Sequence, residues 1–88
     1  MKYSDGNIAE LRDLIAIDIK YRGLVIACIG KGEFLKEYVN HDFSVLDKGI
    51  MVLTDFGGLI YYPDDYREHI ILVERNSSKH PIKYSRNL

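Results

Sequence analysis

Residues 50–62 read IMVLTDFGGLIYY, so two apolar runs are separated by a pair of glycines. Such a pair is typical of a β-hairpin, because glycine adopts the positive φ angles that a tight turn between antiparallel strands requires. The stretch therefore predicts one strand over 50–55 and a second over 59–62. Pro63 ends the second strand because it has no N–H to donate, and the run HIILVE at 69–74 predicts a third strand.

The chain before this hairpin predicts a helix and two further strands. Four apolar residues lie at helical intervals near the N-terminus, which predicts a short amphipathic helix over 7–15. Its polar side would carry Glu10, Arg12 and Asp13. Apolar and polar residues alternate over 17–21, then Arg22 and Gly23 suit a turn, and an apolar run fills 24–29.

Residues 33–39 fit either a second short helix or an extended segment. The predicted fold class is therefore α+β and β-rich: a small, curved antiparallel sheet of about five strands with an N-terminal helix, and a second short helix in one of the two alternatives.

Four of the predicted strands are continuous apolar runs without alternation. Continuous runs indicate that both faces of a sheet are covered. Two short helices cover one face at most, so the sheet must either curl around its own core or bury a face against a partner. A homodimer is one such solution, because identical chains commonly bury surface against each other.

The segment from Gly49 to Glu74 carries, in order, a hairpin with a Gly-Gly tip, the run Leu-Ile-Tyr-Tyr-Pro, one turn and a closing strand. This order resembles the latter part of an SH3-like small barrel. The resemblance covers about a third of the chain and implies a fold only, because one fold hosts many functions.

Length and charge limit the number of domains and the kind of fold. Eighty-eight residues allow one domain, and a composition of 47% hydrophobic and 28% charged residues is that of an ordinary globular domain. Residues 1–74 contain all 13 acidic residues against eight Lys or Arg, whereas 75–88 contain four basic residues and no acid. The sequence thus predicts a single globular domain over 1–75 and a basic, flexible tail over 76–88.

Residues that could carry chemistry are few. Cys28, the single cysteine, lies inside an apolar run, which favours a core position over a reactive thiol. The three histidines are far apart in sequence and no cysteine or acidic pair completes a metal spacing. We expect no enzyme, no metal site and no cofactor, because no set of nucleophile, base and orienting group is present.

Tyrosines and carboxylates around Pro63 are the feature that favours binding, since tyrosine is enriched at recognition surfaces. We expect a small non-enzymatic protein-interaction module, such as a regulatory, adaptor or inhibitor protein, that acts through a sheet face or an aromatic patch. The patch would comprise Phe56, Tyr61, Tyr62, Asp64, Asp65, Tyr66 and Arg67.

Nucleic-acid binding is the alternative function, with a small barrel as platform and the basic tail as an electrostatic arm. The residues for this would be Arg75, Lys79, Lys83, Tyr84 and Arg86. The acidic body argues against it, so the expected partner is another protein of unknown identity, with a homodimer as an option. No signal peptide and no apolar run of about 20 residues is found, which predicts a cytoplasmic protein without membrane contact.

Overall fold

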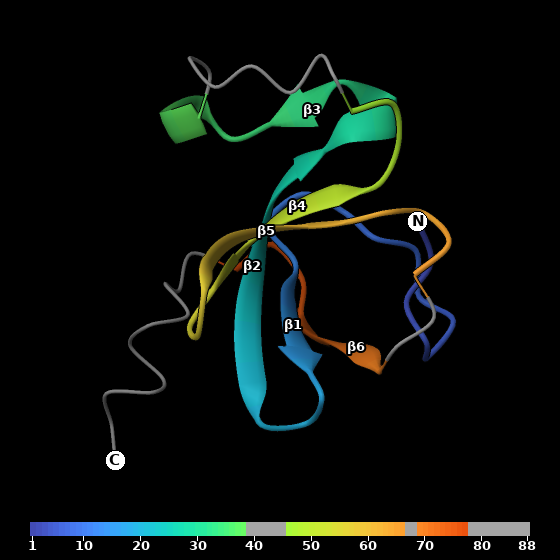
Figure 1. Cartoon of the computed structure of the whole chain (residues 1–88), viewed down its shortest axis with the longest axis vertical. Helices are drawn as coiled ribbons and strands as arrows, with labels where there is room; N and C mark the ends of the chain where they lie inside the picture. Colours follow the sequence, from blue (N-terminus) through green and yellow to red (C-terminus); the bar gives the residue numbers. More distant parts are fainter. Residues whose placement is uncertain (39–45, 67–68, 78–88) are drawn as a thin grey trace.

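The computed structural model describes residues 1–38, 46–66 and 69–77 and contains one antiparallel sheet (Figure 1). The strands are β1 (Leu14–Ile17), β2 (Tyr21–Cys28), β3 (Glu33–Phe34), β4 (Ile50–Thr54), β5 (Gly58–Tyr62) and β6 (Ile70–Glu74). Their order is β5-β4-β2-β1-β6, and β3 pairs with the end of β2. The sheet is open, because β5 and β6 lie at its two ends. Its β-rich, antiparallel character is as predicted, although it has six strands and not about five.

The hairpin predicted from the Gly-Gly pair is confirmed. β4 and β5 pair in register, with Val52 opposite Ile60 and Thr54 opposite Gly58. Gly58 has a φ of 71°, so the second glycine supplies the left-handed conformation of the turn. The third strand of this region, β6, pairs with β1 at the far end of the sheet.

The predicted strand over 17–21 is wrong, because this segment contains a turn. β1 ends at Ile17 and β2 begins at Tyr21, and these two residues face each other across the hairpin. Asp18 and Ile19 both have positive φ angles, of 51° and 70°. Arg22 and Gly23, expected in a turn, lie inside β2. The alternation of apolar and polar residues gave a wrong prediction here, because Ile19 is 72% exposed and does not pack in the core.

The predicted helix over 7–15 is also wrong, and among the described residues no α-helix is found. The N-terminal segment instead folds back on itself, with the Tyr3 N–H donating to the Asn7 carbonyl at 2.8 Å and a bridge between Lys2 and Ile8. Tyr3 and Ala9 are the residues that enter the core, whereas Ile8 is 54% exposed. The α+β class is therefore not observed, because long-range packing outweighed a weak local periodicity.

Asp13, expected on a polar helix face, is completely buried at the start of β1. It accepts hydrogen bonds from the Tyr3 hydroxyl at 2.6 Å and the Glu10 N–H at 2.9 Å. Nη1 of Arg75, which follows β6, lies 3.1 Å from Oδ2. Burial, together with the hydrogen bond to Asp13, raises the pKa of Tyr3 and keeps its hydroxyl protonated as a donor. The first and last described segments thus meet at one carboxylate.

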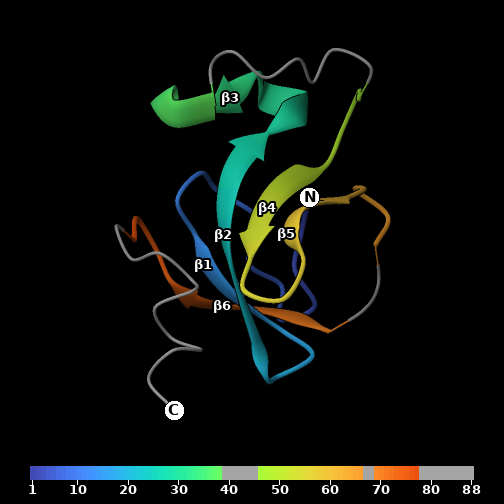
Figure 2. The same ribbon diagram turned by 60° about the vertical axis from the view of Figure 1, so that its left-hand side comes forward.

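Both faces of the central strands are buried, as the continuous apolar runs predicted. One face forms the main cluster, which includes Ile15 of β1, Val25 of β2, Tyr62 of β5 and Ile70 of β6. Since the two end strands of the sheet contribute to the same cluster, the sheet curls around its own core (Figure 2).

The opposite face of β2 is covered by the segment that follows it, which contains no α-helix among its described residues. Leu24, Ile26 and Ala27 pack against Leu35, and Tyr38 lies beside them. Residues 33–38 form the two-residue strand β3 and then a 3-10 helix at Lys36–Tyr38, so each alternative is observed over only part of the segment. Residue 39 lies outside the described residues.

Candidate functional site

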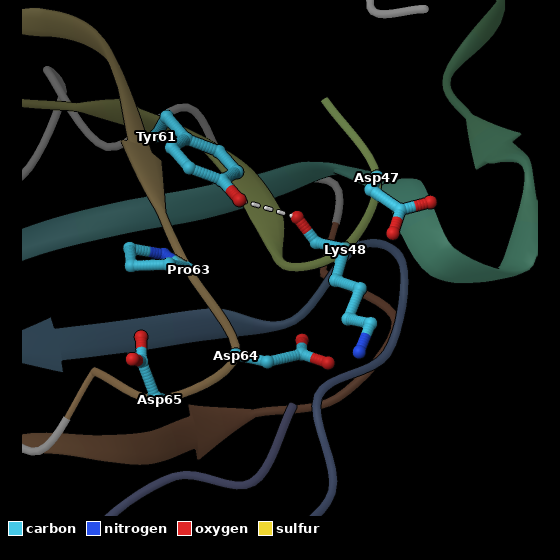
Figure 3. A pocket seen from close by; sticks show the side chains of 6 residues that line it. All are labelled: Asp47, Lys48, Tyr61, Pro63, Asp64 and Asp65. Carbon is cyan, nitrogen blue, oxygen red and sulfur yellow. Dashed lines mark hydrogen bonds between the residues drawn. The ribbon is translucent and has the colours of Figure 1, made fainter. Parts of the chain in front are cut away.

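A pocket of about 360 Å³ opens where the segment before β4 meets the end of β5 and the following turn (Figure 3). It is lined by Asp47, Lys48, Tyr61, Pro63, Asp64 and Asp65. Three of these residues belong to the predicted aromatic patch: Tyr61, Asp64 and Asp65. The structure therefore brings part of that patch together with two residues from a segment more than ten positions earlier in the sequence.

Close backbone packing positions the two walls of this pocket. The Tyr61 hydroxyl donates a hydrogen bond to the Lys48 carbonyl at 2.6 Å, which fixes the ring against the opposite wall (Figure 3). Gly49 follows with a φ of 98°, and a Cβ atom there would lie 2.4 Å from the Tyr62 carbonyl oxygen. Only glycine permits this approach, so the position of residues 47–48 against β5 depends on it.

The charges around the pocket are mainly negative. Asp47, Asp64 and Asp65 line the pocket together with one lysine, Lys48. Oδ1 of Asp64 lies 3.5 Å from the N-terminal amine of Met1. Asp47 and Asp65 are exposed and form no ion pair with any described residue. An aromatic ring and a proline beside free carboxylates can hold a cationic group with an apolar stem.

The grouping of acidic side chains decides whether a metal ion could bind. Among the residues that the structure describes, no three His, Cys, Asp or Glu side chains are grouped closely enough to hold an ion. Each carboxylate that lines the pocket can accept hydrogen bonds from a ligand.

A second cavity of about 210 Å³ has Asp64 in common with the first pocket and extends to Cys28, Lys31 and Gly49. Cys28 is buried, as predicted, and burial raises the pKa of its thiol to about 11. A thiol with this pKa is almost entirely protonated at neutral pH and is a poor nucleophile.

Two predicted patch residues belong to the core and not to the pocket. Tyr62 is buried, and its ring meets the Tyr66 ring edge-on with centroids 4.8 Å apart. Burial, with the nearby Tyr66, raises the pKa of Tyr62 to about 12. Alternation along β5 explains the split, because Tyr61 and Tyr62 point to opposite faces.

Phe56 and Arg67 are the remaining patch residues. Phe56 is on the turn between β4 and β5, where its ring packs against Tyr21 at 4.5 Å between centroids. This turn is at the opposite end of β5 from Pro63, so Phe56 does not join the pocket. Arg67 lies outside the described residues.

The residues predicted for nucleic-acid binding are only partly described. Arg75 contacts Asp13 and also lies 3.2 Å from Glu10, so its guanidinium already has carboxylate partners. Lys79, Lys83, Tyr84 and Arg86, like most of the predicted tail, lie outside the described residues. Nucleic-acid binding and the flexible tail therefore stay predictions.

Sequence reasoning missed the contribution of Asp47, Lys48 and Pro63 to the pocket. Nothing in the sequence around residues 47–49 showed that this segment would lie against Tyr61. The register of the β4–β5 hairpin, in which Ile50 lies opposite Tyr62, brings the two segments together.

Comparison with known proteins gives no relative. No protein-family model matches the chain, and no curated protein and no solved structure is significantly similar to it. Among the described residues, no helix is long and apolar enough to cross a membrane. The function must therefore be argued from the pocket and the sheet themselves.

Proposed function

We propose that this chain is a non-enzymatic protein-binding module that takes a basic, extended peptide segment into the pocket between Lys48 and Asp65. The single observation behind the proposal is the combination of Tyr61 and Pro63 with two carboxylates, Asp47 and Asp65, that lack a described partner. A lysine or arginine side chain supplies both the apolar stem and the cation that such a surface fits.

The size and shape of the opening support a side chain as the ligand, and not a large cofactor. A volume of about 360 Å³ is at the small end for ligand pockets. Because the pocket is at the surface, the rest of a peptide would run across the neighbouring sheet. Regulatory, adaptor and inhibitor proteins all use such contacts.

An SH3-like small barrel, left open between β5 and β6, is the fold that we propose for this module. Support comes from the curled sheet, whose two end strands contribute to one core cluster, and from the short turn Pro63–Tyr66 between them.

Peptide titration tests the proposal. The probe is a fluorescein-labelled peptide of alternating alanine and arginine, and the matched peptide carries glutamate in place of each arginine. We expect the arginine peptide alone to bind and to shift the amide signals of Lys48, Tyr61 and Asp65 in a two-dimensional NMR spectrum. Binding of both peptides with equal affinity, or shifts confined to other regions, would overturn the proposal.

A matched pair of variants separates the pocket from the overall negative charge. Asp65→Asn should weaken binding about two- to five-fold, as expected for one exposed ion pair. The control is Asp18→Asn at the turn between β1 and β2, which removes the same charge outside the pocket and suits its positive φ of 51°. If both variants weaken binding equally, the peptide senses only net charge and the pocket is not the site.

A further inference from the structure

One end of the sheet is left with unpaired backbone groups. The Asp55 N–H donates to the Arg22 carbonyl at 2.9 Å, so at this position the β4 backbone faces β2. Backbone groups alternate in direction along an antiparallel strand, so those of Thr54 and Val52 face β5.

The same alternation determines which β5 groups face outwards. Gly58 and Ile60 lie opposite Thr54 and Val52, so their backbone groups point towards β4. Leu59 and Tyr61 consequently direct their N–H and carbonyl groups away from the sheet. Among the described residues no backbone or side-chain group bonds to these four outward groups.

The other end of the sheet is protected. In β6, the Ile70 N–H donates a hydrogen bond to the Ser4 hydroxyl at 3.1 Å. The same hydroxyl donates a hydrogen bond to the Ile70 carbonyl at 2.7 Å. The Leu72 N–H donates to Oδ2 of Asp5 at 2.8 Å. The N-terminal segment thus caps the β6 edge in the way that proteins block unwanted strand pairing, whereas no residue in the part of the chain that the structure describes caps the β5 edge in this way.

The composition of β5 also favours pairing. Residues 56–63 read FGGLIYYP and contain no charged side chain, and proline occurs only at the end. Charged residues and internal prolines are the usual means of blocking an exposed edge. Leu59 is 38% exposed on the outer face, where it adds to an apolar surface with Leu53 beside it.

We propose that two copies of this chain form a symmetric dimer in which β5 pairs antiparallel with β5 of the second copy, with Ile60 opposite Ile60 of that copy. In this register Leu59 of each copy lies opposite Tyr61 of the other, so all four outward groups of each copy are satisfied. The two Leu–Tyr pairs on the outer face add the aliphatic–aromatic contacts that stabilise antiparallel strands.

The neighbouring registers are less favourable. With Tyr61 opposite its own copy, Leu59 would face Pro63, which has no N–H. With Leu59 opposite its own copy, Tyr61 would face Gly57, whose N–H is already donated to Oγ1 of Thr54 at 3.0 Å. The proline and the hairpin turn therefore select the register centred on Ile60.

Sedimentation equilibrium tests the dimer over about 20 µM to about 1 mM, a range that spans the weak affinities expected for a small interface. We expect the mass to rise from 10.2 kDa towards twice that value. Leu59→Lys should keep the protein monomeric, whereas the control Val73→Lys should still dimerise, because Val73 is similarly exposed, at 46%, on the capped strand. Circular dichroism shows whether each variant is folded.

Amide hydrogen exchange tests the register. Exchange at Leu59 and Tyr61 should slow about ten-fold between the two concentrations, and exchange at Ile60, already bonded to β4, should change little. A monomer at the highest concentration, or a dimer that Val73→Lys disrupts and Leu59→Lys does not, would overturn the proposal. The proposed dimer contacts do not include the Asp65 carboxylate, so Asp65→Asn should leave the dimer unchanged.

Discussion

Replacing Arg75 by methionine should destabilise the protein through the buried carboxylate of Asp13. Nη1 of Arg75 lies 3.1–3.2 Å from both carboxylate oxygens, and the Asp13 side chain has no solvent exposure. Removing one partner of a fully buried ion pair costs about 3–5 kcal/mol. The Arg75 side chain is 36% exposed, so water can replace part of its contact, and we expect a loss of about 2 kcal/mol in the free energy of unfolding.

Urea denaturation followed by circular dichroism measures this loss, and the melting temperature should fall by about 8–16 °C. The control is Glu10→Gln, which removes the exposed partner of the same guanidinium but keeps the Glu10 N–H bonded to Asp13. It should cost less than about 1 kcal/mol. In an Asp13→Asn background, Arg75→Met should cost markedly less, because no buried charge remains. The reasoning is refuted if Arg75→Met costs no more than Glu10→Gln, or costs the same in both backgrounds.

Three further predictions follow from individual residues. Ile19→Gly should stabilise the protein by about 1 kcal/mol, seen as a higher melting temperature, because a β-branched residue is strained at a φ of 70°; a lower melting temperature would contradict this. Cys28 should react with a thiol reagent at pH 8 about 100-fold more slowly than free cysteine, owing to its pKa of about 11, and denaturant should abolish the difference; fast labelling of the folded protein would contradict it. Burial raises the pKa of Asp5, but hydrogen bonds from the backbone N–H groups of Asn7 and Leu72 outweigh burial and lower the pKa. The ionised Asp5 therefore stabilises the fold fully above pH 3.8, and this stabilisation is lost as the pH falls through the lowered pKa. Asp5→Asn should therefore lower the melting temperature at about pH 7 but not at about pH 2, and equal effects at both would argue against it.

The hairpin of β4 and β5 could be predicted from the sequence because its information is local: a glycine pair between apolar runs defines both strands. Local sequence could not show that the helix predicted over 7–15 is absent. Its apolar spacing was real, but the hydrogen bonds of Tyr3 and Asp13 to distant groups decide the fold of that segment. The buried carboxylate of Asp13 gains its cationic partner only when Arg75, 62 residues later, is in place.

The candidate pocket was predictable in part for the same reason. Tyr61, Asp64 and Asp65 are neighbours in sequence, so their proximity was expected. Asp47 and Lys48 join them only because Gly49 allows the chain to pass within contact of Tyr62. Alternation along β5 could assign Tyr61 and Tyr62 to opposite faces, but it could not say which of them is buried.

The meeting of the first and last described segments has a consequence for synthesis on the ribosome. Ser4, Asp5 and Asp13 all bond to residues between Ile70 and Arg75, so the opening residues must wait until nearly all of the described chain has emerged. The hairpin of β4 and β5 needs no such delay. Pulse-labelling during refolding should therefore find amides of β4 protected early and those of β6 last, because pairings distant in sequence form slowly.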